Sequence, residues 1–251
     1  MSLDQTPEKF PDKLPQQPLE NASQPSSEES LIRACIKGDR TLVAQLLTQG
    51  ISPDARWQSS TGLMWAAMEN HADIVDLLLV SGTDINLRND AGYTALMYAA
   101  ESDRRDMVLA LLERDADITG RNSYQETVLM MLARHGQTDI IEQLIRQGAD
   151  VHAVNRIGDT ALYLAVDNGH AYTVGSLIKA SAKVNTANIG GWTPLMMASA
   201  RGDLDTMSLL LANGADVTPV NRWGQTALSQ AKKSFRAQSA IALLTEAGAT
   251  E

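Results

Sequence analysis

The sequence predicts an all-α repeat solenoid, in which pairs of short helices stack on one another and are joined by β-hairpin-like turns. Two observations support this fold class. A threonine recurs with a constant spacing of 33 residues, and a leucine stands two residues after each threonine. The threonines are Thr61, Thr94, Thr127, Thr160, Thr193 and Thr226. A whole structural unit is therefore repeated along the chain.

Each unit contains two segments with the apolar spacing of a helix. In one unit, Leu96, Ala99 and Ala100 recur at i, i+3 and i+4, and Met107 and Leu111 show the same spacing further on. The threonine precedes the first segment, where its hydroxyl can accept a hydrogen bond from an unpaired amide of the first turn. Each unit therefore predicts a capped helix, a turn and a second helix.

The turns contain residue types that tolerate a left-handed backbone. The position between the two helices is occupied by Gly38, Asn70, Asp103, Gly136, Gly169 and Gly202. The position after the second helix is occupied by Gly50, Gly82, Gly148 and Gly214, whereas Asp115 and Ser181 depart from glycine there. Both sets predict tight helix ends.

A longer connection between units carries an asparagine whose side chain can hydrogen-bond its own turn. The asparagines are Asn89, Asn122, Asn155, Asn188 and Asn221, again 33 residues apart. In four of these connections a glycine follows three residues later. We therefore expect a shaped turn that protrudes from each unit.

Two stretches, Gly191-Trp192-Thr193-Pro194-Leu195 and Gly214-Ala215-Asp216-Val217, resemble the ankyrin repeat. The resemblance covers about residues 31 to 249 and implies seven repeats, the terminal ones degenerate. It implies an ankyrin repeat domain over residues 29–251 with a concave binding surface. The approximate units are 31–56, 57–88, 89–121, 122–154, 155–187, 188–220 and 221–251.

This sequence departs from the family at the histidine that usually follows the threonine motif. Its place is taken by Met64, Met97, Met130, Tyr163, Met196 and Ser229. The methionines could form an adaptable binding strip, but we predict that they pack between repeats. The resemblance to the family therefore holds, although the residue that follows the threonine motif differs.

Residues 1–28 are predicted to form a proline-rich, extended and flexible tail, because they hold five of the eight prolines and few large apolar side chains. Phe10, Leu14 and Leu19 are spaced in a way that would suit docking into a groove. Self-association of a scaffold through this tail is the alternative function.

Charge and hydropathy limit the classes of partner that the chain can bind. A net charge of −9 argues against nucleic acid, and no apolar stretch is long enough for membrane insertion, so we expect a soluble chain. We expect a cytoplasmic location by default; removal of a leader would instead indicate a periplasmic or secreted protein.

The sequence contains no pattern typical of an enzyme. The four histidines lack metal-ligand spacing, Gly190-Gly191 lacks the spacing of a dinucleotide loop, and Cys35 is interpreted as a core residue. The carboxylates Asp167, Asp203 and Asp205 are interpreted as solvated or capping groups. We therefore expect no catalytic residue, no metal and no cofactor.

What remains is a non-catalytic module that binds an unidentified protein. The predicted contact residues lie on the hairpin tips and on the exposed helix ends, and aromatic and arginine side chains dominate protein interfaces. They are Trp57, Asp90, Tyr93, Tyr124, Glu126, Arg134, Arg156, Asp159, Trp192, Arg201, Arg222 and Trp223. The alternative is that the aromatic rings only lean on neighbouring turns.

Overall fold

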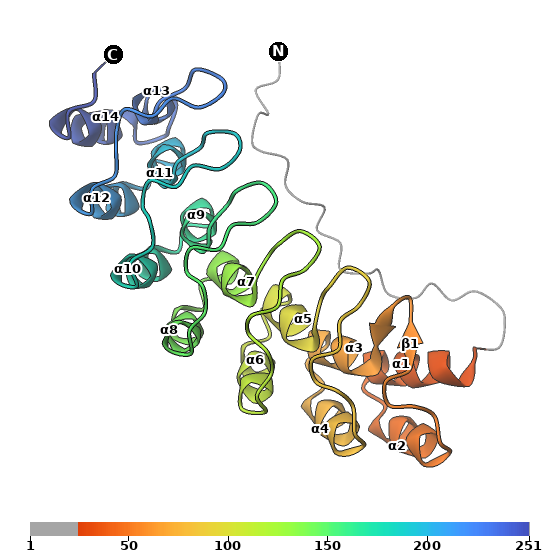
Figure 1. The fold of residues 1–251 in the computed structure, drawn as a ribbon. Coiled ribbons are helices and arrows are strands. Elements are labelled where there is room, and N and C mark those ends of the chain that lie inside the picture. The colour runs from red at the N-terminus through yellow and green to blue at the C-terminus, as the bar shows by residue number, and fades with distance from the viewer. Residues whose placement is uncertain (1–24, 251) are drawn as a thin grey trace. The chain divides into compact units, whose positions relative to one another are not determined.

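The computed structural model describes residues 25–250, which form seven successive helix pairs (Figure 1). The chain divides into two compact units, unit 1 over residues 25–117 and unit 2 over residues 118–250. Helix α1 begins at Ser27, inside the range predicted as tail. Phe10, Leu14 and Leu19 lie outside the described residues.

Unit 1 contains three helix pairs and a short hairpin. The pairs are α1 (Ser27–Lys37) with α2 (Arg40–Thr48), α3 (Gly62–Met68) with α4 (Ala72–Val80), and α5 (Ala95–Glu101) with α6 (Arg105–Leu112). Strands β1 (Arg56–Trp57) and β2 (Ser60–Thr61) pair antiparallel, with Arg56 opposite Thr61. The first helix of each pair packs on the first helix of the next, α1 on α3 and α3 on α5.

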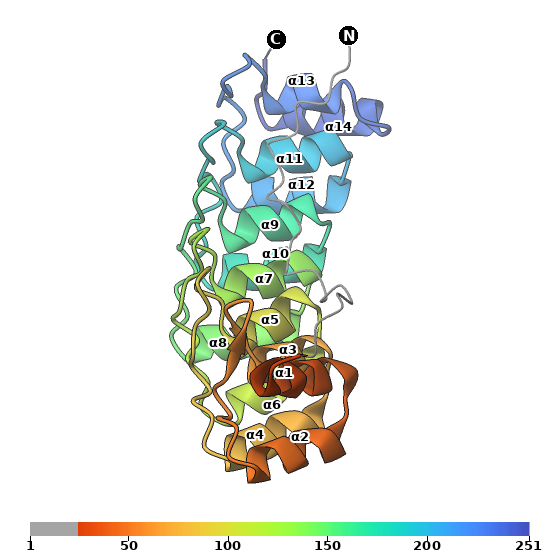
Figure 2. The same ribbon diagram turned by 90° about the vertical axis from the view of Figure 1, so that its right-hand side faces the viewer.

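Unit 2 repeats this arrangement four times. Its pairs are α7 (Val128–His135) with α8 (Thr138–Arg146), α9 (Ala161–Asp167) with α10 (Ala171–Lys179), α11 (Pro194–Arg201) with α12 (Leu204–Ala212), and α13 (Ala227–Ala231) with α14 (Ala237–Glu246). Helices α7, α9, α11 and α13 form one row and α8, α10, α12 and α14 a second row. Within the unit, the hairpins lie along one edge (Figure 2).

Every predicted threonine cap is present. The hydroxyl of Thr94 accepts a hydrogen bond from the backbone N–H of Met97 at 3.3 Å, and the other five threonines make the same bond three residues on. Each bond satisfies one of the amides left unpaired at a helix start. The 33-residue spacing of threonine is therefore the spacing of the first-row helix starts.

The predicted left-handed positions are also present, including the two non-glycine departures, Asp115 (φ 57°) and Ser181 (φ 66°). Two features require a glycine at residue 136. Its φ is 72°, and a Cβ atom there would lie 2.5 Å from the His170 ring of the next repeat. That ring donates from Nε2 to the carbonyl oxygen of Arg134 at 2.9 Å, so the glycine lets one repeat bond to the next.

The core lies between the two rows and between neighbouring repeats. Met64, Met97, Met130 and Met196 are all buried in it, which confirms that they pack in the interior. Cys35 is buried as well, and burial raises the pKa of its thiol to about 12. The thiol is therefore protonated and acts as a small apolar side chain.

Replacing Met97 with alanine is expected to lower the free energy of unfolding by about 2–5 kcal/mol, because the side chain is fully buried and a cavity would remain. Met68→Ala, at the half-buried end of α3, is the matched control and should cost about 1 kcal/mol or less. Urea unfolding followed by circular dichroism measures both. Similar losses at the two positions would contradict the interior role of Met97.

Candidate protein-binding surface

The base of each hairpin in unit 2 is held by one asparagine side chain. The Oδ1 atom of Asn188 accepts from the backbone N–H of Gly190 at 3.0 Å and of Trp192 at 3.1 Å. The same pair of bonds is made by Asn122, Asn155 and Asn221. The hairpins therefore have a fixed shape set by an amide rather than by a long strand pair.

Neighbouring hairpins of unit 2 are also bonded to one another. The backbone N–H of Arg156 donates to the carbonyl oxygen of Tyr124 at 2.8 Å, that of Ile189 to Ile157 at 2.9 Å, and that of Arg222 to Gly190 at 3.0 Å. Four hairpins, residues 122–126, 155–159, 188–192 and 221–225, thus form one continuous row. We call it the hairpin row.

Large apolar side chains are exposed at the tips of the hairpin row. Ile189 is 54% and Trp223 44% exposed, and the charged side chains of Arg156 and Arg222 beside them are exposed too. A Cβ atom at Gly190 would lie 3.2 Å from the Trp223 ring and 3.3 Å from Trp192. The absence of a side chain at residue 190 therefore leaves room for the Trp223 ring.

The position immediately before each capping threonine, the pre-threonine position, behaves differently from the tips. The expectation that Trp192 is presented at a tip is wrong, because its side chain is only 6% exposed. Glu126 and Asp159 are buried as well, and half-buried Tyr93 packs edge-on against Tyr98 of α5 at 5.6 Å. The hairpin closes at this position, so its side chain is held against the first-row helices.

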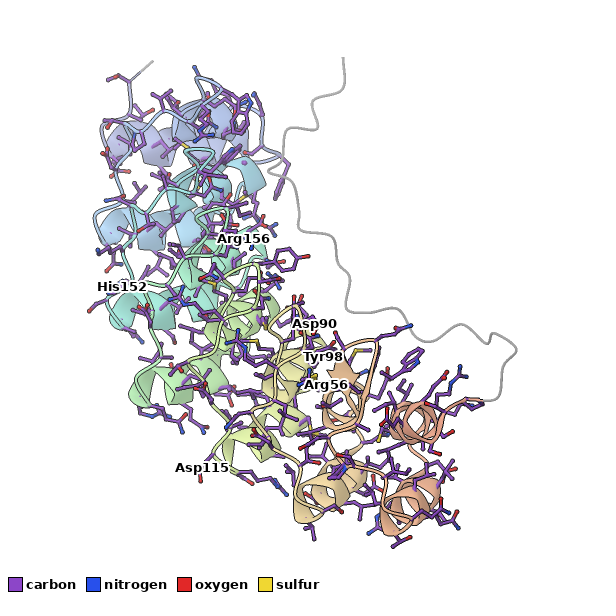
Figure 3. The ribbon with its side chains drawn as sticks, turned by 45° about the vertical axis from the view of Figure 1, so that its right-hand side comes forward. Arg56, Asp90, Tyr98, Asp115, His152 and Arg156 are labelled. Carbon is purple, nitrogen blue, oxygen red and sulfur yellow. The ribbon has the colours of Figure 1, made fainter. Side chains whose placement is uncertain are left out.

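In unit 1 three polar side chains behind the hairpins, Ser60, Asn89 and Tyr98, bond to one another. The hydroxyls of Ser60 and Tyr98 are 2.8 Å apart, and the Asn89 amide donates to Tyr98 at 3.1 Å. Burial raises the pKa of Tyr98, and these two bonds partly offset it. Two predicted contact residues lie in unit 1. Asp90, on a hairpin of this unit (Figure 3), is exposed, and Trp57 is half-buried.

In unit 2 the buried pre-threonine residue Glu126 forms an ion pair with Arg134, which is partly exposed. Arg134, at the end of α7, donates to Glu126, whose other oxygen accepts from the Asn122 amide at 3.1 Å. Glu126 therefore has a cation and an amide for its two oxygens, which is what a buried carboxylate requires. Both predicted contact residues are engaged within the protein.

Asp159, one repeat further on, lacks such a cation. It is 4% exposed, and its Oδ1 atom accepts from the Asn188 amide at 3.0 Å. Burial and, to a smaller extent, the charge of Asp167 raise the pKa of Asp159 to about 6, while the Asn188 and Asn155 amides and Arg134 act in the opposite direction. The ionised form is therefore poorly compensated.

Four buried polar atoms between residues 135 and 192 make no hydrogen bond within the described part of the chain. They are His135 Nε2, Asn155 Nδ2, Tyr163 Oη and Trp192 Nε1. Burial raises the pKa of Tyr163, and the charges of Asp159 and Asp167 raise it further; the nearby Asn188 amide opposes this, although it lacks hydrogen-bond geometry toward the hydroxyl. Native proteins rarely leave buried polar groups unpaired.

The sequence did not single out three of these features. Asp167 was interpreted as a solvated or capping carboxylate, Tyr163 was noted only as a replacement for the family histidine, and Ile189 was not among the predicted contact residues. A comparison of equivalent positions in successive repeats could have revealed that Asp167 is unusual. Glu126 and Arg134 of one repeat correspond to Asp159 and Asp167 of the next. Arg201, a predicted contact residue, donates to the backbone carbonyl of Asp167 at 2.6 Å.

Residues 25–250 were also compared with the requirements of a metal site and of a membrane-spanning helix. No group of three histidine, cysteine or carboxylate side chains could hold a metal ion there. None of the helices described is both long enough and apolar enough to cross a membrane. The arrangement is that of a surface with fixed backbone, exposed apolar tips and charged groups behind them.

The comparison with protein families agrees with this architecture. The family model described as "Ankyrin repeats (3 copies)" matches residues 31–122, 120–188 and 177–250. The chain belongs to the ankyrin repeat family. Ankyrin repeats are generally protein–protein interaction modules, and the family is typically non-catalytic. A comparison with curated proteins gave no match.

The raised pKa of Asp159 in this ankyrin repeat protein makes a prediction about stability. A carboxyl whose folded pKa is about 6, against 3.8 ordinarily, binds a proton more tightly when folded, so its ionisation should lower stability as the pH rises from about 4 to 6. Asp159→Asn should therefore be more stable than the parent at pH 7 by about 1–3 kcal/mol.

Near pH 3 the two proteins should have nearly equal free energies of unfolding, since that pH lies below both pKa values and Asp159 is then largely protonated in the folded and in the unfolded state. Urea unfolding at a series of pH values measures the difference. A variant less stable than the parent at pH 7 would mean that ionised Asp159 is well compensated.

Proposed function

We propose that this ankyrin repeat protein binds a protein partner through the hairpin row of unit 2 and the adjoining ends of its first-row helices. The observation that supports this most strongly is the exposure of Ile189 and Trp223 on neighbouring hairpins whose backbones are bonded together. Large apolar side chains on a rigid backbone lose little conformational entropy on binding, and tryptophan is frequent among residues that dominate interfaces.

The charges around the tips favour a protein over a polyanion. Arg156 and Arg222 are exposed on the hairpins, while Asp167 lies behind them at the end of α9. A surface with both signs can select a partner by complementarity and can exclude partners with the wrong pattern. The overall charge of −9 adds to this, because a phosphate backbone would be repelled.

The site differs from the one expected from the sequence in its central residues. Trp192 and Glu126 are buried, so they would act by supporting the surface, whereas Ile189 and Trp223 would contact the partner. Tyr124 is half-buried on the neighbouring hairpin and its carbonyl holds Arg156 in place. The proposed contact centre is therefore on residues 189 and 223.

The test begins with affinity capture from the native source, using the full chain as bait, and identification by mass spectrometry. The double variant Ile189→Ala with Trp223→Ala is then compared with the parent by calorimetry. Both side chains are exposed, so the fold should be retained, and the dissociation constant of the partner should rise at least about tenfold.

Tyr172→Ala is the matched control. Tyr172 is 90% exposed on α10, in the second row of the same unit. The substitution therefore removes an aromatic side chain that lies away from the hairpin row. It should leave the affinity unchanged. Unchanged binding in the double variant, or an equal loss in the control, would exclude the hairpin row as the binding surface.

A further inference from the structure

The last helix pair differs from the others at the turn between its two helices. In the six preceding pairs this turn contains a residue with positive φ, such as Gly202 (φ 63°). The equivalent residue, 33 positions later, is Phe235, which does not adopt a positive φ. An aromatic side chain disfavours the left-handed backbone. The first-row helix of this pair therefore ends early, and α13 has 5 residues where α11 has 8.

Residues 232–236 complete the connection between α13 and α14 as a compact turn, which we call the basic turn (Figure 1). The backbone N–H of Lys233 donates to the carbonyl oxygen of Gln230 at 3.0 Å, and that of Ser234 to Ala231 at 3.1 Å. The Ser234 hydroxyl donates to the same carbonyl of Ala231 at 3.0 Å. These bonds give the turn a defined shape.

The basic turn also packs against the preceding repeat. A Cβ atom at Gly202 would lie 3.3 Å from Ser234 Oγ and 3.4 Å from Cε1 of Phe235. One edge of the Phe235 ring is therefore close to the backbone of that repeat, yet the residue is 79% exposed. The guanidinium carbon of Arg236 lies 5.3 Å from the ring centroid, within the range of a cation–π contact. Ring and guanidinium thus form one exposed surface on an ordered turn.

The charge of the basic turn is opposite to that of the whole chain. Residues 217–245 contain four arginine and lysine residues and no carboxylate, whereas the net charge of the chain is −9. Lys232, Lys233 and Arg236 are three of these four, and all are exposed. Neither Lys233 nor Arg236 forms an ion pair with residues 25–250. Asp203, the carboxylate that follows Gly202 in the preceding repeat, caps α12.

The fold does not account for this combination of side chains. A terminal repeat needs a polar outer face for solubility, which lysine and arginine alone would supply. Glycine, asparagine or aspartate at residue 235 would allow the helix end used by the other repeats. An aromatic ring exposed among cations instead offers an apolar contact and charge together, which is the combination found at protein interfaces.

We propose that the basic turn is a second binding surface, which takes an acidic protein segment with an apolar side chain beside its carboxylates. The carboxylates would pair with Lys233 and Arg236, and the apolar side chain would cover the exposed ring of Phe235. This surface is separate from the hairpin row, because hairpin 221–225 precedes α13 and the basic turn follows it. The inference therefore goes beyond the proposed function and does not depend on it.

The extent of the positive charge favours a short protein segment over a bilayer or a nucleic acid. The cations are gathered in one turn, which a peptide of a few residues can cover. A bilayer or a nucleic acid extends further, so it would also be repelled by the negative charge of the rest of the chain.

The test selects a random phage-displayed peptide library on the full-length chain, after depletion on the double variant Lys233→Glu with Arg236→Glu. Depletion removes peptides that bind elsewhere, including those on the hairpin row. The peptides that remain should be rich in aspartate and glutamate and contain an aromatic or aliphatic residue. Absence of enriched acidic peptides after depletion would overturn the proposal.

Fluorescence anisotropy then measures the affinity of an enriched peptide for the variants. Lys233→Glu with Arg236→Glu, and separately Phe235→Ala, should each weaken binding at least about tenfold. All three side chains are exposed, so the melting temperature followed by circular dichroism should be unchanged. Unchanged affinity in either variant would overturn the proposal.

Two control variants match these changes elsewhere in unit 2. Lys179→Glu with Lys183→Glu reverses the same number of exposed charges, at and just after the end of α10. Tyr172→Ala removes an exposed aromatic ring from the same helix. Both should bind the peptide as the parent does. A loss equal to that of the basic-turn variants would indicate a general effect of charge or apolar surface and would overturn the site.

Other ligands and the hairpin row are distinguished by two further measurements. Co-sedimentation with phosphatidylcholine vesicles containing phosphatidylserine, abolished in Lys233→Glu with Arg236→Glu, would assign the turn to a lipid surface and overturn the acidic segment. Ile189→Ala with Trp223→Ala should bind the enriched peptide like the parent. A loss there would place the peptide on the hairpin row, so the second surface would be wrong while the proposed function stood.

Discussion

A single asparagine side chain at the base of each hairpin in the hairpin row determines where the rest of the candidate surface lies. Its oxygen accepts two backbone N–H groups of its own hairpin, and in Asn122, Asn188 and Asn221 the amide nitrogen donates to a further side chain. For Asn188 that side chain is Asp159 of the preceding repeat. One residue thus shapes the hairpin, directs the pre-threonine side chain inward and links two repeats.

The stacked helix pairs explain why the surface can change while the fold is kept. Each repeat contacts only its neighbours, so stability comes from threonine caps, tight helix ends and inter-repeat packing. Methionine can replace the usual histidine after the threonine because it fills the same interior space. The residues at the hairpin tips do not take part in this packing, and Ile189 and Trp223 are exposed there.

Much of the fold follows from sequence because its determinants are local. Thr94 caps a helix, Asp103 adopts a left-handed turn, and Met97 is buried, all as the 33-residue spacing predicts. The burial of Trp192 did not follow, because it depends on how the Asn188 amide folds the hairpin back. A pattern of residue types places a side chain in a hairpin but does not give its direction.

The candidate site was only partly predictable for the same reason. Exposed Arg156, Arg222 and Trp223 follow from their places in the hairpins. The effect of Asp167 on Asp159 did not, because the two were interpreted separately, one as a tip residue and one as a solvated helix end. The charge of Asp167 raises the pKa of Asp159, an effect across eight residues that no spacing in a single repeat reveals.

In the proposed complex, the partner lies on the hairpin row of unit 2. Hydrogen–deuterium exchange of the full chain, with and without the captured partner, tests it most directly. Binding should slow exchange in residues 188–192 and 221–225 and at the end of α9, with α8, α10 and α12 unchanged. Protection confined to those second-row helices would contradict the account.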